Sequence, residues 1–165
     1  MTQTVEAAQR VRPIPEGYHS LTPALVVRDA AKAIEFYKRA FGARELSRMA
    51  SPDGQSVWHA EIQIGDSRLM LGDESPDMSA LRAPTSLGGS ASSVHLYVED
   101  ADAAFQRAVD AGATVSMPLE DAFWGDRYGR VTDPFGHEWA IATHTEDMSD
   151  EEALRRGEAF AANPA

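Results

Sequence analysis

Residues 27–43, VRDAAKAIEFYKRAFGA, predict the end of a strand, a helix and a turn in immediate succession. Asp29 belongs to the residue types that cap helix N-termini, and Gly42 to the type that ends helices. Between them, apolar residues recur with helical spacing at positions 30, 33, 34, 37 and 41. We therefore predict a helix that buries one face. Phe36 lies off this stripe, and we expect it at an interface or at the edge of the stripe.

The same plan recurs about 70 residues later, in residues 98–113, VEDADAAFQRAVDAGA. Asp100 and Gly112 repeat the start and stop signals of the first helix. Each helix follows one β-like run and precedes three more. The predicted strands are 21–27, 43–49, 57–64 and 67–71, then 93–98, 114–117, 127–132 and 138–143. This repetition indicates a duplicated βαβββ unit.

The repeat predicts an α+β fold in which two βαβββ modules form a curved mixed-sheet cup. The modules span residues 18–72 and 93–144, and a linker loop rich in Ser, Pro and Gly joins them across residues 73–92. We expect residues 1–17 to form a flexible N-terminal arm. The acidic tail, residues 145–165, contains a capping box from Ser149 to Glu152 that predicts a short helix.

Composition excludes several classes of function. The net charge of −11 argues against nucleic-acid binding, which needs clustered Lys and Arg. The absence of cysteine excludes disulfides, thiolate zinc sites and a cysteine nucleophile. No apolar run is long enough to cross a membrane, and the N-terminus lacks the features of a secretory signal. These features predict a cytoplasmic protein that does not bind membranes.

Strand alternation predicts which side chains line the cup. In the strand 57–64, the residues Trp58, Ala60, Ile62 and Ile64 form an apolar face suited to the helix, so His59, Glu61 and Gln63 face the cup. The first strand directs Thr22, Ala24 and Val26 inward by the same argument. His95 and Tyr97 face the cup from the fifth strand, and Glu138 from the last one, where Trp139 and Ile141 contact the helix.

We accordingly predict a ligand-binding set of seven residues: His59, Glu61, Gln63, His95, Tyr97, Trp124 and Glu138. His59 and Glu61 form either an acid–base pair or an ordinary pair on a strand face. Trp124 belongs to a cluster with Phe123, Tyr128, Arg127 and Arg130, which either covers a planar ligand or packs at the module edge. His95 either contacts ligand or joins His144 in an unusual metal site.

Four segments carry a resemblance to a known family: IPEGYHSLTP (14–23), AIEFYKRAFG (33–42), HAEIQIGD (59–66) and MPLEDAFWGDRYGRVTDPFG (117–136). They resemble the vicinal-oxygen-chelate superfamily, which includes glyoxalase I, bleomycin- and fosfomycin-resistance proteins and extradiol dioxygenases, and most closely its PhnB-like branch. The likeness implies a cup built from two βαβββ units. Ala24 departs from it, because relatives often carry an aromatic residue there.

The resemblance also implies where a metal would bind, with one ligand on the first and one on the fourth strand of each unit. Those positions fall on Thr22, Met70, Ser93 and Ala140, none of which has an imidazole or a carboxylate. We therefore expect no metal and no cofactor. A shift of two residues would recruit His95 and Glu138, which leaves an atypical metal site open.

Three functions remain after this reasoning. The first is a homodimeric protein that binds a small molecule in a metal-free cavity. The second is a metal-dependent lyase or isomerase of the glyoxalase type. The third is a metal-independent enzyme that uses His59, Glu61 or His95 for proton transfer. Whether the protein catalyses a reaction is left open.

Overall fold

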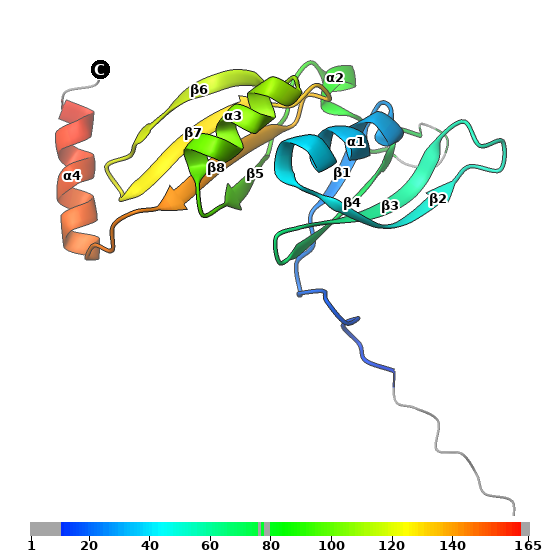
Figure 1. The fold of residues 1–165 in the computed structure, drawn as a ribbon, viewed down its shortest axis with the longest axis horizontal. Helices are drawn as coiled ribbons and strands as arrows, with labels where there is room; N and C mark the ends of the chain where they lie inside the picture. The colour runs from blue at the N-terminus through cyan, green and yellow to red at the C-terminus, as the bar shows by residue number, and fades with distance from the viewer. Residues whose placement is uncertain (1–10, 76, 78–79, 163–165) are drawn as a thin grey trace, which may run out of the picture.

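The computed structural model describes residues 11–75, 77 and 80–162. Two modules, each a helix on a four-stranded sheet, lie next to one another (Figure 1). The first contains β1 (Ala24–Val27), α1 (Ala30–Phe41), β2 (Arg44–Ala50), β3 (Val57–Ile64) and β4 (Ser67–Asp73). The second contains β5 (Ser93–Tyr97), α3 (Ala101–Ala111), β6 (Thr114–Asp121), β7 (Asp126–Thr132) and β8 (Glu138–His144). The predicted α+β fold of two βαβββ modules is confirmed.

The two sheets share one topology. Their strand orders are β1-β4-β3-β2 and β5-β8-β7-β6, and in each the first strand pairs with the last in parallel while the other pairs are antiparallel. The register repeats as well, because Ala24 pairs with Met70 and His95 pairs with Ala140. Equivalent positions of the two modules can therefore be compared directly.

Some element boundaries differ from the prediction. β1 begins at Ala24, so Thr22 lies before the strand rather than within it. β6 continues to Asp121, past the predicted end at position 117. Within residues 73–92, β4 extends through Asp73 and a short helix, α2, covers Pro84–Leu87. The tail helix α4 (Asp150–Ala162) lies at the outer end of the second module (Figure 1).

Both long helices begin and end where the sequence signals lie. The Asp29 carboxylate accepts a hydrogen bond from the Lys32 N–H, and the Asp100 carboxylate accepts one from the Ala103 N–H. Gly42 and Gly112 end the helices with positive φ. A further cap comes from the last strand of each sheet: Asp73 accepts from the Ala30 N–H at 2.7 Å, and Thr143 accepts from the Ala101 N–H at 2.8 Å.

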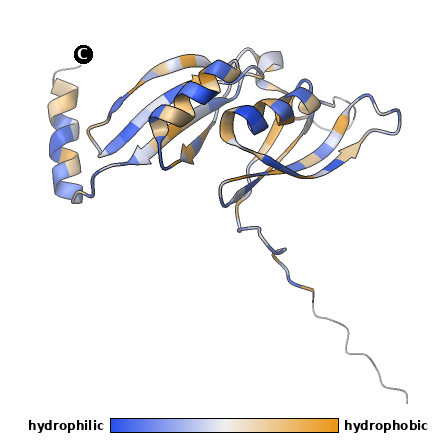
Figure 2. Cartoon of the chain, in the orientation of Figure 1, coloured by the Kyte–Doolittle hydropathy of each residue, from blue (hydrophilic) through white to orange (hydrophobic). Residues whose placement is uncertain are grey.

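The core lies between the sheets and the two long helices, which pack against each other. Apolar and hydrophilic residues are interleaved along the strands (Figure 2), as expected for sheets with one buried face. Phe36 is buried and its ring meets the Phe135 ring of the second module at 6.2 Å, which places it at the contact between modules. Trp139 packs on Phe41 with a ring separation of 4.5 Å.

None of the helices in the described part of the chain combines the length and apolar character needed to cross a membrane.

Candidate functional site

Each sheet has one face on its helix and one face turned away from it, which we call the open face. Helix-side residues such as Val27, Ile62 and Ile141 are fully buried. The side chains of the opposite face are at least partly accessible, except those of Asp126, Ala140 and Ala142. The first open face comprises Ala24, Val26, His59, Glu61, Gln63, Arg68, Met70 and Gly72. The second open face comprises Ser93, His95, Tyr97, Asp126, Tyr128, Arg130, Glu138, Ala140, Ala142 and His144.

The prediction for Trp58 was wrong. Met49 pairs with His59 and Ala50 with Val57, so Trp58 is the extra residue of a bulge in β3. The bulge breaks the alternation at this point. Val57 takes the buried position with 5% exposure, and Trp58 is 43% exposed rather than packed on the helix. Trp58 therefore joins the first open face.

The first open face holds a row of charged groups. His59 Nε2 lies 3.5 Å from Glu61 Oε1, and Arg68 Nη1 lies 3.8 Å from Glu61 Oε2. The nearby Tyr18 hydroxyl, with further help from His59 and Arg68, holds the pKa of Glu61 below its ordinary value although partial burial opposes this. Gln63 accepts a 2.8 Å hydrogen bond from Arg44. Glu61 is thus an ionised acceptor between two cationic or ionisable partners.

The second open face is organised around the buried carboxylate of Asp126, which is 3% exposed. The Tyr97 hydroxyl donates to Oδ2 at 3.0 Å and the Trp124 indole N–H donates to the same oxygen at 2.9 Å. His144 Nδ1 lies 2.8 Å from Oδ1. Burial opposes ionisation of Asp126, but these hydrogen bonds, led by that of His144, hold its pKa below the ordinary value.

Aromatic rings cluster over this carboxylate. The rings of His95 and Tyr97 are 4.5 Å apart, His95 and Tyr128 are 5.8 Å apart, and Trp124 meets Tyr128 edge-on at 5.1 Å. The predicted residues His95, Tyr97 and Trp124 are therefore brought together. Sequence reasoning missed Asp126, although its alternation with Tyr128 along β7 placed it on the same face.

Glu138 lies apart from that cluster. Its carboxylate accepts hydrogen bonds from Thr132 and, at 2.8 Å, from Ser116. Arg130 reaches Ser93 at 3.5 Å. The predicted residues thus fall into two groups within one chain: His59, Glu61 and Gln63 on the first open face, and His95, Tyr97, Trp124 and Glu138 on the second.

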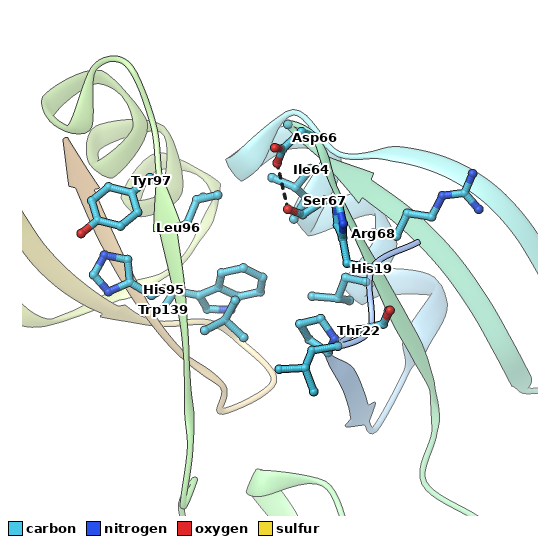
Figure 3. Close-up of a pocket in the computed structure, with 15 residues that line it drawn as sticks. His19, Thr22, Ile64, Asp66, Ser67, Arg68, His95, Leu96, Tyr97 and Trp139 are labelled. Carbon is cyan, nitrogen blue, oxygen red and sulfur yellow. Dashed lines mark hydrogen bonds between the residues drawn. The ribbon is translucent and has the colours of Figure 1, made fainter. Parts of the chain in front are cut away.

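A cleft of about 350 Å³ separates the modules. Figure 3 shows one wall with His19, Thr22, Ile64, Asp66, Ser67 and Arg68, and the other wall with His95, Leu96, Tyr97 and Trp139. The dashed line marks the 2.8 Å bond from Ser67 to Asp66. The lining of the cleft is mostly apolar and includes Trp139 from the core. His95 and Tyr97 line this cleft, but His59, Glu61 and Gln63 do not, so the cleft does not connect the two groups of predicted residues.

The donor groups do not fit a divalent metal. At the level where Ala24 pairs with Met70, the second module offers His95 opposite Ala140. Two residues earlier on each of these strands, Ser93 pairs with Glu138. The Glu138 carboxylate already accepts hydrogen bonds from two hydroxyl groups. Each of these two pairs in the second module therefore supplies one side chain suited to bind a metal ion, His95 in one and Glu138 in the other. Within residues 11–75, 77 and 80–162, no three His, Asp or Glu side chains are grouped closely enough to hold an ion.

Comparison with known proteins gives one matching family. The sequence model of the Glyoxalase/Bleomycin resistance protein/Dioxygenase superfamily matches residues 19–141. An uncharacterised protein of Mycobacterium tuberculosis is 50% identical over 135 residues, which cover 81% of this chain and 79% of that protein. An uncharacterised protein of Arabidopsis thaliana is 33% identical over 127 residues, covering 72% of this chain and 74% of its own length.

Solved structures agree. The crystal structure of an Arabidopsis thaliana gene product has a TM-score of 0.61 and 32% identity, and the match covers 76% of this chain and 98% of that one. TioX from Micromonospora sp. ML1 has a TM-score of 0.59 and 28% identity, and the match covers 75% of this chain and 97% of TioX. A PhnB protein from Bacillus cereus, at 19% identity and a TM-score of 0.59, shares the fold; the match covers 76% of this chain and 99% of that one.

Proposed function

The chain belongs to the glyoxalase/bleomycin resistance protein/dioxygenase superfamily. On this basis we propose that it binds a small molecule, without a divalent metal, at a site to which both the first and the second open face contribute. The observation that supports this most is the Asp126 cluster. A buried carboxylate that holds Tyr97, Trp124 and His144 in place creates rigid aromatic surface before any ligand arrives. Preorganised groups of this kind lower the entropic cost of binding.

The cluster also remains accessible, as a binding surface must. Tyr97 is 60% exposed and Trp124 is 37% exposed, although both have their polar atoms bonded to Asp126. Exposed rings whose hydrogen bonds are already satisfied offer their faces and edges for contact. The ligand would therefore stack on His95, Tyr97 and Trp124, while Glu61 and Glu138 supply acceptors from the two sheets.

We propose that the protein is a homodimer. In one chain the first and second open faces form separate surfaces. Met49 pairs with His59 and Met117 with Arg130, so both methionines lie on these faces. The large apolar side chains exposed on or beside the two faces are Met49, Trp58, Tyr97, Met117 and Trp124. A second copy that laid its second open face over the first open face of its partner would cover these residues and bring the two predicted groups together. Sedimentation that shows only monomer at micromolar concentration would contradict this arrangement.

A metal-independent proton-transfer enzyme is the second candidate, and the His59–Glu61 pair at 3.5 Å favours it. Such an enzyme would lose turnover in His59→Ala while ligand binding persisted. A metal-dependent lyase or isomerase needs a ligand set that the register of β5 and β8 does not supply. Elemental analysis of untagged protein after incubation with nickel, zinc, manganese or iron tests that alternative, with His95→Ala and Glu138→Ala as matched variants.

The proposed binding function is tested by native mass spectrometry of protein purified without denaturation. We expect a retained small molecule that Tyr97→Ala and Trp124→Ala release, with Gln106→Ala as the control because Gln106 is exposed on α3, away from both open faces. Retention by neither wild type nor control would count against the proposal. We also propose a cytoplasmic location, supported by the absence of cysteine, which subcellular fractionation would check.

A further inference from the structure

We propose that a recess on the first open face binds a flat, uncharged aromatic part of the ligand. The inference rests on the proposed binding function and specifies the chemistry of one part of its site. The recess has a volume of about 280 Å³. Its walls are formed chiefly by Ala24, Val26, Trp58, His59 and Met70.

The recess exists because two positions of the first module carry small side chains. By the repeated register, Ala24 and Val26 correspond to His95 and Tyr97 in the second module. There, two rings tilted toward one another occupy the space above the sheet, with centroids 4.5 Å apart. In the first module a methyl group and an isopropyl group leave that space empty. The volume missing from the first face is thus about that of aromatic side chains.

The β3 bulge provides an aromatic wall for this space. It turns Trp58 out of the core, so that the indole stands beside Met70 and His59 at the recess. Gly72 permits the bulge, because a Cβ at that position would lie 2.6 Å from the Trp58 carbonyl oxygen. An indole face and a thioether are surfaces on which an aromatic ring packs favourably.

The hydrogen bonds around the recess favour an uncharged occupant over a cationic one. Of the described residues that line it, Asp73 is the one carboxylate. Its Oδ1 accepts the Asp29 and Ala30 N–H groups at 2.8 and 2.7 Å, and its Oδ2 accepts the Val57 N–H at 2.7 Å. An ammonium or amidinium group would have to compete with these three bonds for the carboxylate. An uncharged ring needs no such exchange, and His59 at the edge can hydrogen-bond one polar substituent.

The recess is tested with 2-naphthol as the ring probe and benzamidine as the cationic probe, followed by NMR of the full-length protein. The three indole N–H signals are assigned with Trp58→Phe, Trp124→Phe and Trp139→Phe. We expect 2-naphthol to shift the Trp58 signal in a saturable way, and benzamidine to bind at least tenfold more weakly. Shifts confined to Trp124 or Trp139, or equal binding of both probes, would overturn the inference.

The matched variants are Ala24→Phe, which fills the recess, and Ala103→Phe, which adds the same ring at an exposed position of α3, away from both open faces. We expect Ala24→Phe to weaken 2-naphthol binding at least tenfold and Ala103→Phe to leave it unchanged. If Ala24→Phe does not fold, Trp58→Ala replaces it and should weaken binding as well. Unchanged 2-naphthol affinity in whichever of the two variants folds would contradict the proposal.

The same proteins separate this inference from the proposed function. If the molecule retained by native protein binds Ala24→Phe as tightly as wild type, the recess is not part of its site, while the binding function stands. If native protein retains no molecule but 2-naphthol shifts Trp58, the recess is real and the proposed function fails.

Discussion

The hydroxyl of Tyr37, in the first module, donates a 2.8 Å hydrogen bond to the carboxylate of Asp133, in the second. Both groups are buried, and the same Asp133 oxygen accepts the Trp139 indole N–H at 2.9 Å. The other oxygen accepts the Phe135 and His137 N–H groups of the turn that follows β7. Burial, reinforced by Asp133, keeps the pKa of Tyr37 well above its ordinary value, so the hydroxyl remains a donor. One carboxylate thereby joins helix, turn and last strand across the modules.

Removing this carboxylate should destabilise the protein more than removing the hydroxyl. Asp133→Ala leaves two buried side-chain donors without an acceptor, and we expect a loss of about 3 kcal/mol in the free energy of unfolding. Tyr37→Phe leaves Asp133 with its other donors and should cost about 1 kcal/mol. Urea denaturation measures both values. Equal losses for the two variants would show that the carboxylate does not have the joining role described above.

The β3 bulge should depend on the absence of a side chain at position 72. In Gly72→Ala the new Cβ would meet the Trp58 carbonyl oxygen at 2.6 Å, so the bulge has to move. We expect a loss of about 1–3 kcal/mol in urea denaturation, as for other overpacked positions. Gly89→Ala is the control, because no atom lies within 4 Å of its built Cβ and its φ is not positive. The Trp58 emission maximum should also shift in Gly72→Ala alone.

His144 should make stability depend on pH. Its Nδ1 lies 2.8 Å from Asp126 and its Nε2 lies 3.0 Å from Asp147. A neutral imidazole can donate to one of these carboxylates, and only the protonated ring can donate to both at once. Asp126 first, and then Asp147, raise the pKa of His144 above its ordinary value of 6.5. The stabilisation is therefore complete below about pH 6.5 and is lost as the pH rises through the raised value.

This dependence is measured as the thermal midpoint across neutral pH. In His144→Gln the midpoint should fall less between acidic and mildly alkaline pH than in wild type. NMR titration should place the His144 midpoint above 6.5 in wild type and lower in Asp126→Asn. A wild-type midpoint at or below the ordinary value would refute the double contact.

The Asp73 cap should be worth more than its counterpart in the second module. Asp73 accepts three backbone N–H groups, from Asp29, Ala30 and Val57, whereas Thr143 accepts one, from Ala101. We expect Asp73→Ala to lower the free energy of unfolding by about 2 kcal/mol and Thr143→Ala by about 1 kcal/mol. Urea denaturation again compares them, and a larger loss in Thr143→Ala would contradict the comparison.

The regular part of the fold could be predicted from the sequence because local signals and packing agree there. Asp29 and Gly42 bracket α1, and the same pair of residue types brackets α3. Alternation placed His59, Glu61, His95 and Tyr97 on the open faces, since their strand neighbours are apolar. Repetition of one pattern doubled the information available for each element.

The parts that were missed depend on contacts between distant residues. Trp58 resembles its apolar neighbours in type, and only the register between β2 and β3 reveals the bulge that exposes it. Asp126 gains its importance from Tyr97, 29 positions earlier, and from His144, 18 positions later. Alternation along β7 places Asp126 on the open face, but no local feature shows that its carboxylate is buried whereas that of Asp121, at the end of the preceding strand, is exposed.

Asp73 has two roles that any redesign of the recess must respect. It caps α1 and fixes the first residue of β3, and it also lines the recess that we assign to an aromatic ring. A variant library aimed at new ligands can therefore vary Ala24, Val26 and Met70 freely but should keep position 73 constant. Otherwise, clones selected for altered affinity would be confounded by loss of folded protein. The position sets a boundary between the part of the pocket that can diverge and the part that the fold retains.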